Sequence, residues 1–248
     1  NLTLPTHVYF DEVAEALALK SDGDNIDFKP VLVGPVTYLY LAENVSNVIP
    51  KLSRLPSLLA VYQQVLQKLA DLGINWVQID EPILGFELSA EWQNAFNQAY
   101  AELAQTPVKL LLATYFETLG DNLALVCNLP VAGLHYDGLR GEKQLNDLIE
   151  HYPAEKVLSL GLVDGRNVWK TDLNAAIASL KAAKTKFGEQ LWIAPSCSLL
   201  HVPVNLEVEE KLNPELKNYL AFAKQKLAEV KLLADALNGQ ADQQALQA

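Results

Sequence analysis

The stretch Trp76-Val-Gln-Ile-Asp-Glu-Pro82 is the part of this sequence that decides the fold. Its tryptophan, valine and isoleucine are residue types that strands favour, and Pro82 cannot donate to a sheet, so a buried strand should end there. Asp80 and Glu81 then emerge at the carboxyl end of that strand, where parallel α/β proteins build their sites. Taken alone, the pair favours a structural role in which Asp80 caps the following turn and Glu81 is solvated.

Short apolar runs alternate with stretches of helical period along the chain, which is typical of repeated β-α units and a parallel sheet. A last long helix is expected over 214–237, because Pro214 is a start signal and Asn238-Gly239 a stop signal. A seventh strand over 2–4 is a further option. The strands are expected at 30–39, 76–80, 109–116, 133–137, 157–163 and 191–196.

The pattern predicts an α/β protein of the (β/α)8 TIM-barrel type that is incomplete, with its first β-α units missing, because about six strands are visible where closure needs eight. An open parallel sheet is the alternative. No linker-like segment divides the chain, so residues 1–239 are expected to form one partial barrel domain and 240–248 a frayed tail.

Composition excludes several classes of partner. The 248 residues carry a formal net charge of -11, which repels nucleic acid and anionic membrane surfaces. No apolar run is long enough for a membrane span. Cys127 and Cys197 are the only cysteines and lie too far apart for a disulfide framework, so a reducing cytoplasm is the expected location.

Polar residues follow several of the expected strands, and in a barrel they would converge on one rim. Each also has an ordinary structural explanation. A mixed zinc site from His135, Asp137, Cys197 and His201 lacks any closely spaced ligand pair, and no neighbouring base activates Cys197 as a nucleophile. The residues expected on the substrate side of the rim are Asp80, Glu81, His135, Asp137, Arg166 and His201.

Six segments in order along the chain resemble cobalamin-independent methionine synthase, specifically the N-terminal half of that two-barrel family. They are Lys29-Pro-Val-Leu-Val-Gly-Pro-Val-Thr37, Val61-Tyr-Gln-Gln-Val-Leu66, Trp76-Val-Gln-Ile-Asp-Glu-Pro82, Lys109-Leu-Leu-Leu-Ala-Thr-Tyr-Phe-Glu117, Gly165-Arg-Asn-Val-Trp169 and Ser196-Cys-Ser-Leu-Leu-His201. The resemblance implies transfer of a methyl group from a 5-methyltetrahydrofolate polyglutamate to homocysteine, whose thiol is activated by zinc.

The resemblance also implies that zinc belongs to the C-terminal half. At the strand equivalent by duplication, Thr114 and Phe116 replace the family's His-x-Cys pair, and Cys197 is at most a degenerate remnant of the last zinc cysteine. This chain is therefore expected to bind no metal or cofactor and to be non-catalytic by itself. Asp80-Glu81 recurs in both halves, where the C-terminal copy helps to bind substrate; here it is expected to be retained architecture that hydrogen-bonds the rim.

The implied partners are the C-terminal catalytic barrel of the same enzyme and a folate polyglutamate at the interface between the two halves. An exposed sheet edge also suggests a homodimer. Two alternatives stay open. The chain is either a stand-alone barrel enzyme related to zinc methyltransferases or uroporphyrinogen decarboxylase, or a non-catalytic scaffold that only supports the partner barrel and helps to bury the folate between them.

Overall fold

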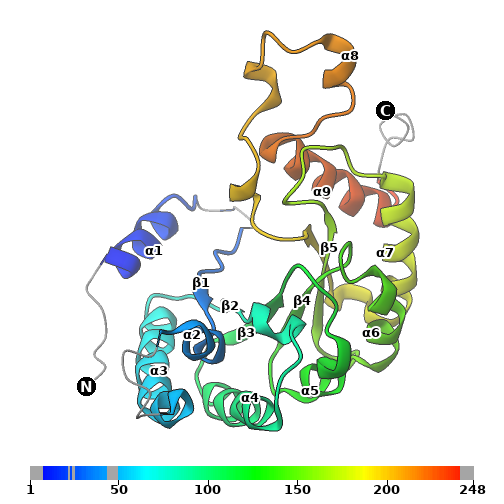
Figure 1. Cartoon of the computed structure of the whole chain (residues 1–248). Helices are drawn as coiled ribbons and strands as arrows, with labels where there is room; N and C mark the ends of the chain where they lie inside the picture. Colours follow the sequence, from blue (N-terminus) through cyan, green and yellow to red (C-terminus); the bar gives the residue numbers. More distant parts are fainter. Residues whose placement is uncertain (1–7, 22, 24–25, 44–49, 241–248) are drawn as a thin grey trace. The chain divides into compact units, whose positions relative to one another are not determined.

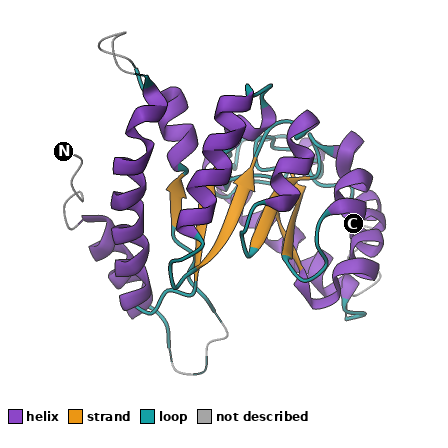
Figure 2. Cartoon of the chain, turned by 90° about the horizontal axis from the view of Figure 1, so that it is seen from below, coloured by secondary structure: helices purple, strands orange, loops and turns teal. Residues whose placement is uncertain are grey.

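The computed structural model describes residues 8–21, 23, 26–43 and 50–240, which fall into two compact units. Unit 1 comprises Asn1–Thr114 and Leu119–Leu134, and unit 2 comprises Tyr115–Thr118 and His135–Ala248. The strands follow one another in the sheet in chain order, β1-β2-β3-β4-β5-β6. The predicted alternation of strands and helices in an α/β fold is thereby confirmed (Figures 1 and 2). The strand considered over 2–4 and the tail 241–248 lie outside the described residues.

Unit 1 carries the first three strands and the helices that follow them. Strand β2 pairs in parallel with β1 on one side, with Leu32 opposite Ile79, and with β3 on the other, with Leu112 opposite Ile79. The elements are α1 (Val8–Ala18), β1 (Val31–Val33), α2 (Pro35–Leu41), α3 (Leu55–Asp71), β2 (Trp76–Asp80), α4 (Ala90–Leu103), β3 (Lys109–Thr114) and α5 (Leu123–Asn128).

Unit 1 differs from the prediction over 30–39. The strand β1 ends at Val33, and α2 begins directly at Pro35. Proline at the first position of a helix loses no intrahelical hydrogen bond, and its fixed φ suits the helix. The apolar run was therefore a strand and a helix in sequence, which periodicity over so few residues does not separate.

Unit 2 carries the later strands. Strand β5 is buried along its whole length and pairs in parallel with β6, with Leu160 opposite Ile193. The elements are β4 (Gly133–Asp137), which begins in unit 1, α6 (Leu145–His151), β5 (Val157–Val163), α7 (Leu173–Phe187), β6 (Leu191–Pro195), α8 (Pro214–Lys217) and α9 (Ala223–Leu237). Figure 1 shows α8 on a long excursion that stands away from α7.

The single helix predicted over 214–237 is wrong. The structure has the short α8 and then α9, separated by residues 218–222. The intervening Leu220 is buried, and the backbone N–H of Ala221 donates to the carbonyl of Val168 at 2.8 Å. A tertiary hydrogen bond and apolar burial thus override the helical period. The end of the helix was predicted correctly, because α9 stops at Leu237 and Gly239 has a φ of 70°.

The sheet in the described residues has six strands, two fewer than a closed (β/α)8 barrel. Within the described part of the chain, no helix combines the length and the apolar character that crossing a bilayer requires.

Candidate functional site at the strand ends

Glu81 follows β2 and is the centre of the strand-end site in unit 1. Its side chain is fully buried. One carboxylate oxygen, Oε1, accepts from the backbone N–H of Val36 at 3.2 Å and from the hydroxyl of Tyr100 at 3.0 Å, and the other accepts from the N–H of Thr37 at 2.7 Å. Glu81 therefore satisfies the free N–H groups in the first turn of α2.

The expectation that Glu81 is solvated and Asp80 caps the next turn is wrong. The 3-10 turn Pro82–Gly85 that follows has no side-chain hydrogen bond at its N-cap. The carboxyl group of Glu81 occupies the space into which a Cβ on residue 34 would project, so only glycine fits at Gly34. Sequence alone gave no sign that a helix 45 residues earlier would begin at this carboxylate.

Burial dominates the electrostatics of Glu81. Desolvation raises the pKa of Glu81 to about 7, although the hydrogen bonds from Thr37, Val36 and Tyr100 act in the opposite direction. No lysine, arginine or histidine of the described residues forms an ion pair with it. Tyr100 is itself fully buried, and desolvation followed by the charge of Glu81 raises its pKa well above the usual value.

Asp80 has a different environment. Its Oδ1 accepts from the side-chain amide of Gln78 at 2.8 Å, and the same Gln78 accepts a hydrogen bond from the ammonium of Lys29. Burial lowers the pKa of Lys29, and the nearby charge of Asp80 partly opposes that shift. Asp80 is half-buried, so its carboxylate belongs to a polar chain at the sheet surface.

Asp137 ends β4 and is the corresponding buried carboxylate of unit 2. Its side chain has no exposed area. Oδ1 accepts from the backbone N–H groups of Leu139 at 3.1 Å and Arg140 at 3.0 Å, and Oδ2 accepts from the N–H of Phe116 at 3.2 Å. These bonds fix the loop that follows β4 and leave Asp137 little capacity for a ligand.

Arg140 is a strand-end residue that the sequence analysis missed. Its Nη1 lies 3.6 Å from Oδ2 of Asp137, and its Nη2 lies 3.2 Å from Oδ1 of Asp164. Nη1 also donates to the hydroxyl of Ser196 at 3.5 Å. The two carboxylates raise the pKa of Arg140 against the lowering effect of its partial burial. A cation three residues after a strand-end acid is the only signal that the sequence offered.

His135 is buried and has a protein partner at each ring nitrogen. Nδ1 lies 3.0 Å from the hydroxyl of Ser159, and Nε2 lies 3.2 Å from the carbonyl oxygen of Ser196. Because a carbonyl only accepts, Nε2 carries a hydrogen and donates to Ser196. The two contacts join β4 to β5 and to the segment that follows β6 within unit 2.

Arg166 and His201 are the exposed members of the predicted set, and they meet at Phe116. The Arg166 guanidinium lies 4.6 Å from the centroid of the Phe116 ring, and the His201 ring meets the same ring edge-on at 6.5 Å. Phe116 has a φ of 74°, which is rare for a bulky residue and often marks a functional position. No carboxylate of the described residues forms an ion pair with the Arg166 guanidinium. Its charge is available to an anion.

The donor set in unit 2 does not fit zinc. Cys197 is buried, its sulfur lies 3.7 Å from the carbonyl oxygen of Ser198, and burial raises the pKa of its thiol. A Cβ on Gly165 would lie 2.9 Å from that sulfur, so the space beside Cys197 is filled. Phe116 has no donor atom. Among the described residues, no three or more His, Cys, Asp or Glu side chains are grouped in a way that would hold a metal ion.

Together, these features define an α/β protein with a parallel sheet whose chain-order strands and strand-end polar groups are those of the βα-barrel class. Residues 1–188 match the protein family described as "Cobalamin-independent synthase, N-terminal domain". This chain belongs to that family. It is 51% identical over 228 residues to a 5-methyltetrahydropteroyltriglutamate--homocysteine methyltransferase of Paraburkholderia xenovorans (strain LB400). That alignment covers 92% of this chain and 29% of the relative, so the chain spans less than a third of the relative's length.

Solved structures share the fold at low sequence identity. A putative vitamin-B12 independent methionine synthase from Listeria monocytogenes has a TM-score of 0.67 at 16% identity, covering 97% of this chain and 71% of that one. A B12-independent methionine synthase from Shewanella sp. W3-18-1 has a TM-score of 0.63 at 14% identity, covering 93% and 67%. The predicted family and fold class are therefore confirmed.

Proposed function

We propose that this chain is the N-terminal part of an enzyme that transfers a methyl group from a 5-methyltetrahydropteroylpolyglutamate to homocysteine, and that it is not catalytic by itself. Its role is to support a C-terminal catalytic half, which holds the zinc, and to contact the folate between them. The relative from Paraburkholderia xenovorans is named for this reaction. Here, residues 1–239 act as one partial barrel domain, located in a reducing cytoplasm, where the buried thiols of Cys127 and Cys197 stay reduced.

The observation that carries this proposal is the Phe116 position. Where the resemblance places the second zinc ligand of the catalytic half, this chain has a phenylalanine between Arg166 and His201. Zinc would supply a thiolate-activating Lewis acid in the catalytic half, but the residues here offer aromatic surface and positive charge instead. Such a surface suits an anionic aromatic ligand, which a folate with a glutamate tail is.

Complementation tests the proposed division of labour. The chain and a separately expressed C-terminal half of the Paraburkholderia relative are assayed for methionine formation, each alone and then mixed. We expect no turnover from this chain, little from the other half, and restored turnover in the mixture. Turnover by the isolated chain would contradict the proposal and favour a stand-alone barrel enzyme related to zinc methyltransferases or uroporphyrinogen decarboxylase. No restoration in a mixture whose two parts are both folded would also count against it.

The buried carboxylates give the stand-alone alternative little support. Glu81 is occupied by two backbone N–H groups and a hydroxyl, and Asp137 by three backbone N–H groups. His135 is held at both ring nitrogens. We therefore assign these three groups to architecture, together with the half-buried Asp80, and assign ligand contact to the exposed Arg166 and His201.

Arg166 is the residue with which to test ligand contact. Arg166→Ala should weaken binding of a pteroyltriglutamate by about tenfold, because it removes a charge-assisted contact with a carboxylate. Arg166→Lys keeps the charge but loses the contact of the guanidinium with the Phe116 ring, so an intermediate affinity is expected. Arg54→Ala is the matched control, since Arg54 is also exposed and lies in unit 1. Equal affinities of all three variants and the parent chain would remove Arg166 from the site.

Self-association through the sheet edge is the second part of the partner proposal. Strand β1 stands at the end of the strand order, and its Val31 and Val33 are 46% and 51% exposed. Exposed valines on an edge strand favour pairing with another strand. Light scattering should detect a dimer that Val31→Lys abolishes. A monomer at all accessible concentrations would exclude this part of the proposal.

A further inference from the structure

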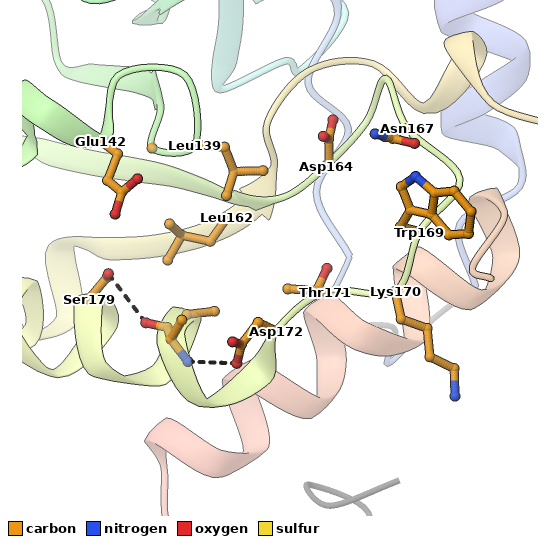
Figure 3. A pocket seen from close by; sticks show the side chains of 13 residues that line it. Leu139, Glu142, Leu162, Asp164, Asn167, Trp169, Lys170, Thr171, Asp172 and Ser179 are labelled. Carbon is orange, nitrogen blue, oxygen red and sulfur yellow. Dashed lines mark hydrogen bonds between the residues drawn. The ribbon is translucent and has the colours of Figure 1, made fainter. Parts of the chain in front are cut away.

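Unit 2 contains a cavity of about 350 Å³ that the proposed function does not use (Figure 3). This volume lies in the range of small-molecule sites. The lining comes from the loop after β4, the end of β5, the segment 164–172 and the first turns of α7. We call the segment 164–172 the strap. All lining residues belong to unit 2, so the cavity is complete within that unit.

The two ends of the cavity differ in chemistry. Figure 3 shows Trp169 at one end and Glu142 at the other, with Leu139 and Leu162 between them. Trp169 is 51% exposed, although an indole of that size is normally covered. Glu142 is exposed, and no cation of the described residues forms an ion pair with it. An aromatic wall, an apolar floor and an uncompensated carboxylate therefore face the same space.

The charges around the cavity select the sign of a ligand. Asp164 and Asp172 also line it, against a single basic residue, Lys170. Asp164 is paired with Arg140, and Asp172 caps α7 by accepting from the N–H of Ala175 at 3.0 Å. The Lys170 side chain extends away from the other labelled side chains in Figure 3. Asp172 keeps its negative charge as a helix cap, and it repels anions together with the carboxylate of Glu142, in a chain with a net charge of -11.

The strap that carries Trp169 is fixed by a buried charge. Lys226 of α9 has no exposed surface, and its ammonium donates to the carbonyl oxygen of Trp169 at 2.9 Å. Glu229 of the same helix accepts from the N–H and the hydroxyl of Thr171 at 3.2 and 2.8 Å. Burial lowers the pKa of Lys226, which reflects the cost of an ammonium out of water. Through these contacts α9 holds the strap at Trp169 and at Thr171.

We propose that this cavity binds a small organic amine with an aromatic or aliphatic body. The body lies against the Trp169 indole and over Leu139 and Leu162, and the ammonium points toward Glu142. The carboxylate supplies a charge-assisted hydrogen bond, and the tryptophan supplies apolar contact area at little entropic cost. Lys226 is a positioning residue, because it acts on the ligand only through the strap.

Binding of 2-phenylethylamine tests the proposal, with the neutral 2-phenylethanol as matched ligand. Fluorine NMR of the 5-fluorotryptophan-labelled chain reports on Trp169, whose signal is assigned from Trp169→Phe. We expect saturable shifts of that signal with at least fivefold tighter binding of the amine than of the alcohol. Glu142→Gln should reduce this preference to near unity, whereas Glu150→Gln, an exposed acid outside the cavity, should preserve it. No saturable shift, or a preference that survives Glu142→Gln, would overturn the proposal.

Lys226→Met tests the positioning role separately from folding. Removal of a buried charge should leave the urea midpoint unchanged or higher, because an apolar chain of similar length replaces the ammonium. Affinity for 2-phenylethylamine should nevertheless fall by about tenfold, as the strap loses an anchor. Lys231→Met is the control on the same helix, where the side chain is 73% exposed. Unchanged amine affinity in a folded Lys226→Met chain would show that the strap needs no such anchor.

Discussion

Unit 1 and unit 2 each bury a carboxylate at the end of a strand, and they stabilise it in different ways. Glu81 in unit 1 accepts hydrogen bonds from neutral groups only, whereas Asp137 in unit 2 has the same kind of backbone donors and also Arg140. Because its donors are all neutral, Glu81 is costly to ionise, and we assign it an architectural role. In unit 2 the ion pairs continue from Asp137 through Arg140 to Asp164, whose side chain is 26% exposed.

The largest effect is expected from Glu81→Ala. Loss of the carboxylate leaves the N–H groups of Val36 and Thr37 and the hydroxyl of Tyr100 without their acceptor in a buried cavity. Several unsatisfied groups plus the cavity should cost about 4 kcal/mol in free energy of unfolding. Urea denaturation measures this, with Glu87→Ala, an exposed acid of the same unit, as the control. A loss below about 1 kcal/mol would show that Glu81 is not the acceptor that holds α2.

The next effect is the pH dependence that Glu81 brings. Its pKa is raised from 4.5 to about 7 in the folded chain, so the folded state holds this proton more tightly than the unfolded state. The stabilisation is fully present below about pH 4.5 and is lost as the pH rises through about 7, a loss of about 3 kcal/mol. The difference between the parent chain and Glu81→Gln in urea midpoints from pH 4.5 to 8 isolates this contribution. If the urea midpoints of the parent chain and of Glu81→Gln changed with pH in the same way, the raised pKa of Glu81 would be contradicted.

A smaller effect is expected for Arg140→Met. The substitution keeps the aliphatic stem but leaves the fully buried Asp137 without its cation. Breaking such a pair is strongly destabilising when it is buried, but Arg140 is 30% exposed, so we expect about 2 kcal/mol. Arg54→Met serves as the control. If Arg140→Met and Arg54→Met unfold at the same urea concentration, the backbone N–H groups alone stabilise Asp137, and the two units do not differ in the way described.

The smallest effect should come from Asp172→Ala. Asp172 caps α7 in unit 2 through its own side chain, in contrast to α2, whose first turn is satisfied by the distant Glu81. A local cap contributes about 1 kcal/mol, and water can replace it at an exposed helix end. Thermal unfolding measures the loss, and Asp172→Asn, which still accepts from Ala175, should restore most of it. A loss as large as that of Glu81→Ala would erase the distinction between local and remote capping.

Sequence patterns located three strands at their observed bounds. The bounds of β2, β4 and β5 agree with the prediction, because apolar and β-branched runs of this length have few alternatives. The strand predicted over 30–39 and the helix predicted over 214–237 were too long. The first error arises because periodicity over so few residues does not separate a strand from the helix that follows it. The second arises from the hydrogen bond between Ala221 and Val168, which are distant in sequence.

The strand-end residues were located less well than the strands. His135, Asp137, Arg166 and His201 do come together in unit 2, yet the predicted solvation of Glu81 is the reverse of what the structure shows. Acceptors of backbone N–H groups leave no local signature, since the donors of Val36 and Thr37 lie far earlier in the chain. Arg140 was missed for the same reason, because its role depends on Asp164 and Ser196 from later strands.

Zinc titration of the chain tests the central proposal most directly, which is that this polypeptide is the part of a methyltransferase that does not hold the metal. Competition with a chromophoric chelator in reducing buffer measures the affinity and the stoichiometry. We expect no site that competes with the chelator, because Phe116 offers no donor and the sulfur of Cys197 is enclosed beside Gly165. One tight site per chain that disappears in Cys197→Ser would contradict the account.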